Sequence, residues 1–161
     1  MAPRTCKIPY RLYLRKALNL ENQTEFSYWL YHIGWVWMKS GVHKRTLRNP
    51  KYPGWVIKVY RNSNGHTKDA AFWNSTPEEI KPFWLPYWYT CRFFVIQPRV
   101  NHKGGDPRDA LKIIQDRIPG CNWKYDVGAN NVAYHNGAPV VFDFNYHPTK
   151  KKKYAKCSKS L

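Results

Sequence analysis

Residues 131–144 read Asn-Val-Ala-Tyr-His-Asn-Gly-Ala-Pro-Val-Val-Phe-Asp-Phe, and they carry the clearest structural signal of the C-terminal half of the chain. Asn136-Gly137 separates two strand-like runs, and an Asn-Gly pair in that setting is the strongest short signal for a β-hairpin. Asp126 and Asn131 come before the first run, and Asp143 follows the second. The sequence therefore predicts a short hairpin whose strands are flanked by two carboxylates and an amide.

Upstream of this hairpin the pattern alternates between helix and strand signals. Asp106 followed by Pro107 is a typical helix start, and apolar residues at helical spacing continue from there to Pro119. The runs 87–91 and 93–97 are rich in aromatic and β-branched residues, which favours two strands.

The N-terminal half begins with a predicted helix and a hairpin. Aromatic and aliphatic residues recur at helical spacing over 24–37, after the weak capping pattern Asn22-x-x-Glu25. Strand-like runs at 43–48 and 55–61 follow, joined by a turn rich in Pro and Gly. A further helix start is predicted at Thr76. Helices and strands in this order predict the α+β class.

The large positive net charge of this sequence sets it apart from an average globular domain. The 161 residues contain 27 Lys and Arg but 10 Asp and Glu, which gives a formal net charge of +17. No carboxylate occurs between 26 and 68, and the chain ends in a lysine-rich tail. We therefore expect a polyanionic partner, either nucleic acid or an acidic protein. The cations proposed to contact it are Lys44, Arg45, Arg48, Lys51, Lys150, Lys151, Lys152 and Lys153.

Composition excludes several classes. With 43% hydrophobic and 17% aromatic residues the chain has ample core material, so disorder throughout is excluded. The four cysteines are widely spaced, which disfavours a zinc site or a disulfide framework. There is no apolar run of membrane-spanning length and no signal-peptide pattern, so we expect a soluble, cytoplasmic protein without membrane contact.

The flanking residues of the hairpin carry a family resemblance. Asp126, Asn131 and Asp143-Phe144 resemble the Asp-x-x-x-x-Asn and Asp-Phe-Gly motifs of the protein kinase family, at close to the family's spacing. The resemblance implies that Asp126 is the catalytic base, and that Asn131 and Asp143 hold Mg²⁺. Such short, lysine-rich chains resemble small bacteriophage proteins assigned as protein kinases, which implies a location in the host cytoplasm.

Features of the N-terminal half extend the resemblance to the ATP site. Trp55-Val-Ile-Lys58 is similar to the family's Val-Ala-Ile-Lys strand, so Lys58 is expected at the nucleotide phosphates. Gly41 falls where the glycine-rich phosphate loop would be, and 94–100 where a strand leads to the adenine-binding hinge. Asp69 is the acid nearest to the place of the glutamate that pairs with the lysine.

The chain also departs from the family pattern. Gly41 is a single glycine where the family has several, and Asn145 replaces the glycine after Asp143-Phe144. Only 16 residues follow Asn145, so the peptide-binding helical lobe of the family is largely missing. The resemblance thus implies a truncated protein-kinase-like fold. We expect a single domain at 1–146, followed by a flexible basic tail at 147–161. Within the domain, the expected parts are a helical extension at 1–35, a sheet at 36–100, and a helix with the hairpin at 101–146.

The sequence leaves three functions open. The first is a minimal phosphotransferase that binds Mg-ATP and phosphorylates a protein hydroxyl, which the resemblance to bacteriophage proteins would place on a host protein. The alternative is a catalytically inert kinase-like module that binds nucleic acid or an acidic host protein through its cations. A third is a binder of single-stranded nucleic acid, because eight Trp and twelve Tyr offer many rings for base stacking.

Overall fold

The computed structural model describes residues 7–40, 44–61, 81–85, 87, 89–90, 93–120 and 127–143. The chain divides into two compact units. Unit 1 consists of Met1–Ala70 and Pro86–Arg99, and unit 2 of Ala71–Leu85 and Val100–Leu161. Each unit has its own β-sheet and its own hydrophobic core.

Unit 1 begins with two helices, α1 (Tyr10–Leu18) and α2 (Gln23–His32). The predicted cap of α2 is confirmed, because the Asn22 side chain accepts hydrogen bonds from the backbone N–H groups of Thr24 and Glu25, both at 3.0 Å. The predicted continuation to about residue 37 is wrong. Gly34 adopts a left-handed φ of +94°, and the next backbone N–H bonds back to Leu30 O at 3.0 Å, which ends the helix.

The sheet of unit 1 has five strands. They are β1 (Val36–Ser40), β2 (Lys44–Arg48), β3 (Trp55–Tyr60), β4 (Tyr89–Thr90) and β5 (Phe94–Pro98). All neighbouring strands are antiparallel, in the order β1-β2-β3-β5-β4. The hairpin predicted from 43–48 and 55–61 is confirmed as β2 and β3. Of the strand predicted at 87–91, the structure describes Tyr89–Thr90 as β4, Tyr87 lies outside this strand, and residues 88 and 91 lie outside the described residues.

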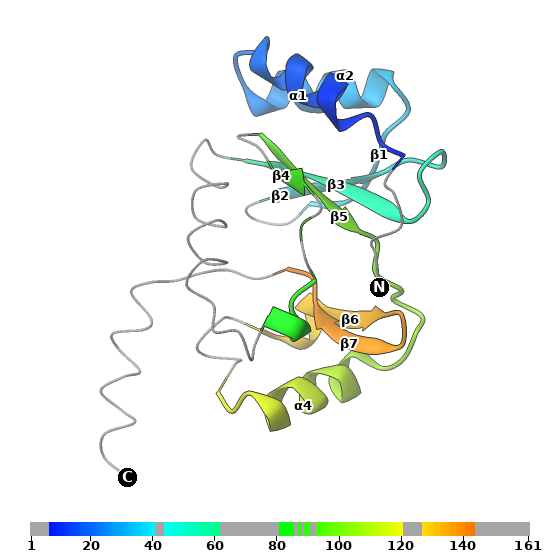
Figure 1. Ribbon diagram of the computed structural model, residues 1–161, viewed down its shortest axis with the longest axis vertical. Helices are drawn as coiled ribbons and strands as arrows, with labels where there is room; N and C mark the ends of the chain where they lie inside the picture. The colour runs from blue at the N-terminus through cyan, green and yellow to red at the C-terminus, as the bar shows by residue number, and fades with distance from the viewer. Residues whose placement is uncertain are drawn as a thin grey trace, which may run out of the picture. The chain divides into compact units, whose positions relative to one another are not determined.

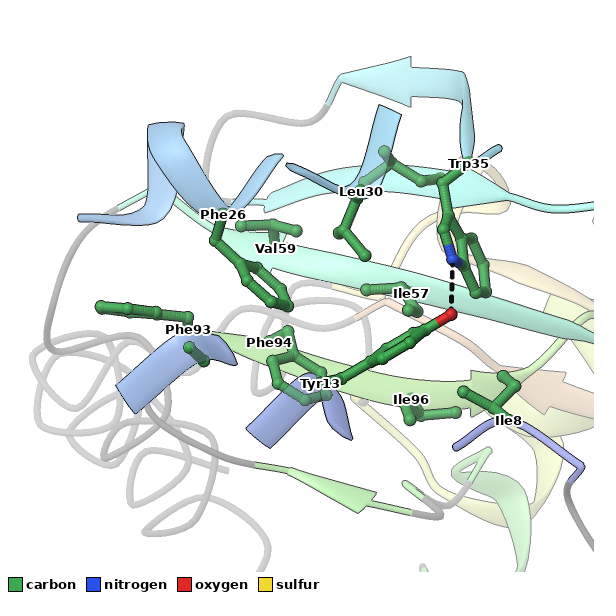
Figure 2. Packing of buried hydrophobic residues seen from close by; sticks show 12 residues of the cluster. Ile8, Tyr13, Phe26, Leu30, Trp35, Ile57, Val59, Phe93, Phe94 and Ile96 are labelled. Carbon is green, nitrogen blue, oxygen red and sulfur yellow. Dashed lines mark hydrogen bonds between the residues drawn. The ribbon is translucent and has the colours of Figure 1, made fainter. Parts of the chain in front are cut away.

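Helices α1 and α2 cover one face of this sheet (Figure 1). In the core between them, the helices contribute Phe26 and Leu30, and the sheet contributes Ile57, Val59 and Phe94. Figure 2 shows how these side chains interdigitate, and how the indole N–H of the buried Trp35 donates to the Tyr13 hydroxyl at 3.0 Å. Burial of so many aromatic rings on one face makes this core the main source of stability of unit 1.

Strand alternation separates the residues of the opposite face. Ile57 and Val59 face the helices, so Val56, Lys58 and Tyr60 lie on the other side of β3. On β2 the same rule puts Leu47 with the core. The pairings across β2, β3 and β5 extend the opposite face to Lys44, Thr46, Arg48, Val95 and Gln97.

Unit 2 contains α4 (Pro107–Arg117) and the hairpin of β6 (Val132–His135) and β7 (Ala138–Val141). Two short 3-10 helices, η1 (Lys81–Phe83) and η2 (Ala129–Asn131), belong to the same unit. Figure 1 shows α4 alongside the hairpin, and α4 buries Ala110 and Ile114. The core under the hairpin is made of Leu85, Val100, Ala133 and Val140.

Two local predictions in unit 2 are confirmed. Asp106 caps α4 by accepting from the Arg108 backbone N–H at 2.8 Å, and the hydrogen bonds from the Arg108 guanidinium lower the pKa of this carboxyl. Asn136 and Gly137 have positive φ values of +53° and +79°, which is the backbone of a type I′ hairpin turn. Together with the sheet of unit 1 these elements confirm the α+β class.

Candidate functional site

The two proposed metal ligands, Asn131 and Asp143, both belong to the open end of the hairpin of unit 2. Val132 pairs with Val141, and one step further the Phe142 backbone N–H donates to Asn131 O at 2.9 Å. Asp143 is the next residue after Phe142, and both Asn131 and Asp143 are half-buried. The hairpin thus brings together two residues that lie twelve positions apart in the sequence.

A short turn of helix holds Asn131 in this place. The Asn131 backbone N–H donates to Gly128 O at 2.9 Å, which closes η2 directly before β6 begins. Val127, just before this turn, is almost fully buried and anchors it. Asp126, the proposed catalytic base, lies outside the described residues.

The side chains at this end of the hairpin are suited to a hard cation. An amide oxygen from Asn131 and a carboxylate from Asp143 are oxygen ligands of the kind that Mg²⁺ takes, with waters and substrate phosphates as its remaining ligands. In the part of the chain that the structure describes, no cluster of three or more His, Cys, Asp or Glu residues forms a metal site. Asn131 and Asp143 could supply at most a few of the oxygen ligands of such an ion, and waters or a ligand would supply the others.

A loop that the sequence reasoning did not single out packs against the same end of the hairpin. His102 contacts the Phe142 ring edge-on, with 5.3 Å between ring centroids. The loop is fixed by Asn101, whose backbone N–H donates to Tyr134 O at 3.0 Å and whose side chain accepts from Lys103 N at 3.0 Å. His102 is therefore held one residue away from Asp143, a neighbourhood that sequence spacing alone does not reveal.

Lys58, the proposed phosphate ligand, is in the middle of β3 in unit 1. It pairs with Thr46 on one side and with Val95 on the other, on the sheet face away from the helices. Its side chain is only 4% exposed. A lysine so deeply buried in the central strand of a sheet is rare without a functional or electrostatic reason.

The four described cations of the proposed polyanion patch do not share one surface. Lys44 is buried, at 7% exposure, on the same sheet face as Lys58. Arg48 is exposed on that face, whereas Arg45 is on the helix side and Lys51 is in the turn after β2. Strand alternation separates Lys44 from Arg45, which adjacency in the sequence had placed together.

Several proposed site residues lie outside the described residues. They are Gly41, Asp69, Asp126, Lys150, Lys151, Lys152 and Lys153. Of the remaining nucleotide-site residues, Lys58 belongs to unit 1, and Asn131 and Asp143 belong to unit 2. Convergence of these three on one cleft stays a prediction.

Within the described part of the chain, no helix combines the length and the apolar character needed to cross a bilayer. No protein-family model matches this sequence, and no curated protein or solved structure matches it significantly.

Proposed function

We propose that the protein is a minimal phosphotransferase that binds Mg-ATP and transfers the γ-phosphate to a protein hydroxyl. The observation that carries the proposal is the backbone pairing of Asn131 with Phe142, which puts Asn131 and Asp143 at the same end of a hairpin. The resemblance to protein kinases requires its two metal ligands to lie near each other, and this backbone pairing is compatible with that requirement. The position of Lys58 on the third strand of an antiparallel sheet supports the same assignment.

The proposed reaction needs positioning, charge and one proton acceptor from the chain. The acceptor oxygen forms a bond to the γ-phosphorus, the bond from that phosphorus to the bridging oxygen breaks, and ADP leaves. Asp126 would orient the acceptor hydroxyl and take its proton. Asn131 and Asp143 would hold Mg²⁺, which neutralises phosphate charge when bound. Lys58 would keep the phosphates in place.

Thermal unfolding with and without nucleotide tests whether this site exists. Mg-ATP at about 100 times its dissociation constant should stabilise the protein by about 2.7 kcal/mol, because only the folded state binds it. ATP without Mg²⁺ should stabilise less. An unchanged melting temperature at millimolar Mg-ATP would remove the basis for the phosphotransferase.

A second candidate function rests on a different observation in unit 1. Described cations there lie over aromatic rings, with 5.3 Å from Arg45 to the Trp37 ring and 5.7 Å from Lys51 to the Tyr52 ring. Lys16 lies over a third ring, that of Trp29, at 5.9 Å. No described carboxylate forms an ion pair with these three cations.

Cations next to aromatic rings suit single-stranded nucleic acid. Bases stack on the rings while the cations neutralise neighbouring phosphates, and neither contact depends strongly on sequence. Trp37 also stacks on Tyr31 at 5.7 Å, so the rings extend from β1 to α2. Burial raises the pKa of Tyr31, while the nearby charge of Arg45 lowers it in part. We propose single-strand binding as the alternative role of unit 1.

The salt dependence of binding to a fluorescent oligonucleotide tests this alternative. Lys51→Ala should lower the slope of log affinity against log salt by about 0.7, the value for one single-strand phosphate contact. Lys112→Ala, an equal charge change on the exposed side of α4, should leave the slope unchanged. If the Lys51 variant instead loses affinity for polyglutamate and not for the oligonucleotide, the partner is an acidic protein.

A further inference from the structure

We infer that Arg45 and Tyr28 form a binding site for one nucleotide of a single-stranded nucleic acid, where the guanidinium binds the backbone phosphate and the Tyr28 ring stacks on the base. The inference rests on the proposed single-strand binding by unit 1 and names the residues of its site. It does not involve the residues assigned to phosphate transfer. It follows from the way Arg45 is held, from the donors that its guanidinium keeps and from the exposure of the neighbouring ring.

Aromatic rings of β1 and α2 fix the position of Arg45. Arg45 is two residues before Leu47 on β2, and Leu47 pairs with Trp37 on β1. Arg45 and Trp37 are therefore diagonal neighbours on the sheet face that carries the helices. The guanidinium carbon is 5.3 Å from the centre of the Trp37 ring, and Trp37 stacks on Tyr31 with 5.7 Å between ring centroids. The arginine is thus held against a ring that is itself stacked, which reduces the side-chain entropy that ligand binding would cost.

The guanidinium of Arg45 keeps hydrogen-bond donors that the described residues do not use. Its Nε is buried and finds no acceptor in the described part of the chain, and no carboxylate there pairs with the guanidinium. The residue as a whole is only half-buried, and among the described residues Nε is the guanidinium nitrogen that is enclosed without a partner. The terminal nitrogens can therefore donate to an acceptor from outside the chain. A planar guanidinium with adjacent N–H groups matches the oxygens of a phosphate.

An exposed aromatic ring lies close to this arginine. Tyr28 is 63% exposed and is three residues before Tyr31 on α2, so the two side chains are neighbours on the helix surface. Burial raises the pKa of Tyr31, the nearby charge of Arg45 lowers it in part, and Tyr28 raises it. Both Arg45 and Tyr28 are thus close to the Tyr31 hydroxyl.

The exposed ring favours nucleic acid over an acidic protein as the partner. Every nucleotide has a phosphate next to a base, which matches a cation next to an exposed ring, and every base has a π-face. Carboxylates of an acidic peptide would bind Arg45 but would gain nothing from stacking on Tyr28. The two residues should therefore contribute differently to strands with and without bases.

Fluorescence anisotropy of the full chain with a single-stranded oligonucleotide of about 16 nucleotides, and with an abasic strand of the same length, tests the inference. Arg45→Gln should weaken binding of both strands by about tenfold or more, the range for loss of a charged hydrogen bond. Tyr28→Ala should weaken binding of the strand with bases by about fivefold or more and leave the abasic strand unchanged. Arg99→Gln is the matched control, because it removes the same charge from an exposed arginine of unit 1 outside this site, and it should barely change either affinity.

The outcomes separate this inference from single-strand binding by unit 1. Equal affinity of wild type and Arg45→Gln for the oligonucleotide overturns the site, and a loss for Lys51→Ala would at the same time leave single-strand binding standing. If wild type binds no oligonucleotide at low salt, both proposals are wrong. Weaker polyglutamate binding by Arg45→Gln, with no effect of Tyr28→Ala on the oligonucleotide, would point to an acidic protein and contradict the inference. Should Arg45→Gln fail to unfold cooperatively, equal affinity of Tyr28→Ala and wild type for the oligonucleotide would itself overturn the inference.

Discussion

Replacing Asp126 by asparagine is expected to lower phosphate transfer from labelled ATP by a factor of about 10² to 10⁴, the usual contribution of a general base. Asparagine keeps the size and hydrogen-bonding outline of the side chain but cannot accept the hydroxyl proton. Binding of Mg-ATP should survive, because Asp126 is assigned to the acceptor side of the reaction. Transfer is measured as label incorporated into a basic protein or a host lysate, and binding by the thermal shift.

Asp143→Ala should differ from Asp126→Asn by losing the magnesium-dependent part of ATP binding together with transfer, since its proposed role is coordination. Asp116→Asn is a suitable control for both variants, because Asp116 is an exposed carboxylate on α4 in the same unit. Transfer by Asp126→Asn at the wild-type rate would show that the assigned base is wrong. Absence of any transfer by wild type would favour the inert binding module.

Phe26→Ala is expected to cost about 3–5 kcal/mol in the free energy of unfolding, as typical for removing a fully buried aromatic ring. Phe26 is 0% exposed, stacks on Phe94 with 5.0 Å between ring centroids and contacts Trp29 at 5.6 Å. The cavity would open between α2 and the sheet, where Figure 2 shows the ring pointing toward Phe94 of β5. For a domain of this size the melting temperature should fall by more than about 10 °C.

Tyr28→Ala provides the control on the same helix. Tyr28 is 63% exposed, so its truncation should change the free energy of unfolding by no more than about 0.5 kcal/mol. Chemical denaturation of both variants monitored by tryptophan fluorescence gives the comparison. A loss below about 1 kcal/mol for Phe26→Ala would mean that α2 does not pack on the sheet as described.

The elements that the sequence predicted well are those formed by interactions between residues close together in the sequence. The cap at Asp106, the turn at Asn136-Gly137 and the hairpin across 49–54 depend on residues a few positions apart, and all three were confirmed. The C-terminal end of α2 was predicted wrongly, because Trp37 fits a helical spacing although it belongs to β1. The glycine at 34 ends the helix through its left-handed backbone, a stronger effect than apolar periodicity.

The candidate site was predictable only where its residues are connected by a short stretch of sequence. Asn131 and Asp143 could be brought together from the sequence because a single hairpin connects them. The burial of Lys44 was not foreseen, because a lysine in an acid-free stretch suggests an exposed patch. Alternation along two paired strands does put Lys44 and Lys58 on one face, but only once the register of β2 against β3 is known. That register depends on tertiary pairing rather than on neighbouring residues.

The division of the chain into units has a consequence for how the protein is made. Unit 1 takes β1 to β3 from one segment and β4 and β5 from a later one, with Ala71–Leu85 of unit 2 between them. On the ribosome, β3 therefore emerges well before β5, its partner on one side. Until residue 98 has been translated, β3, of which five of six residues are buried in the folded protein, has an open edge, which is a site for aggregation. A truncation ending before β5 should thus yield insoluble protein, and neither unit can be produced as one continuous fragment.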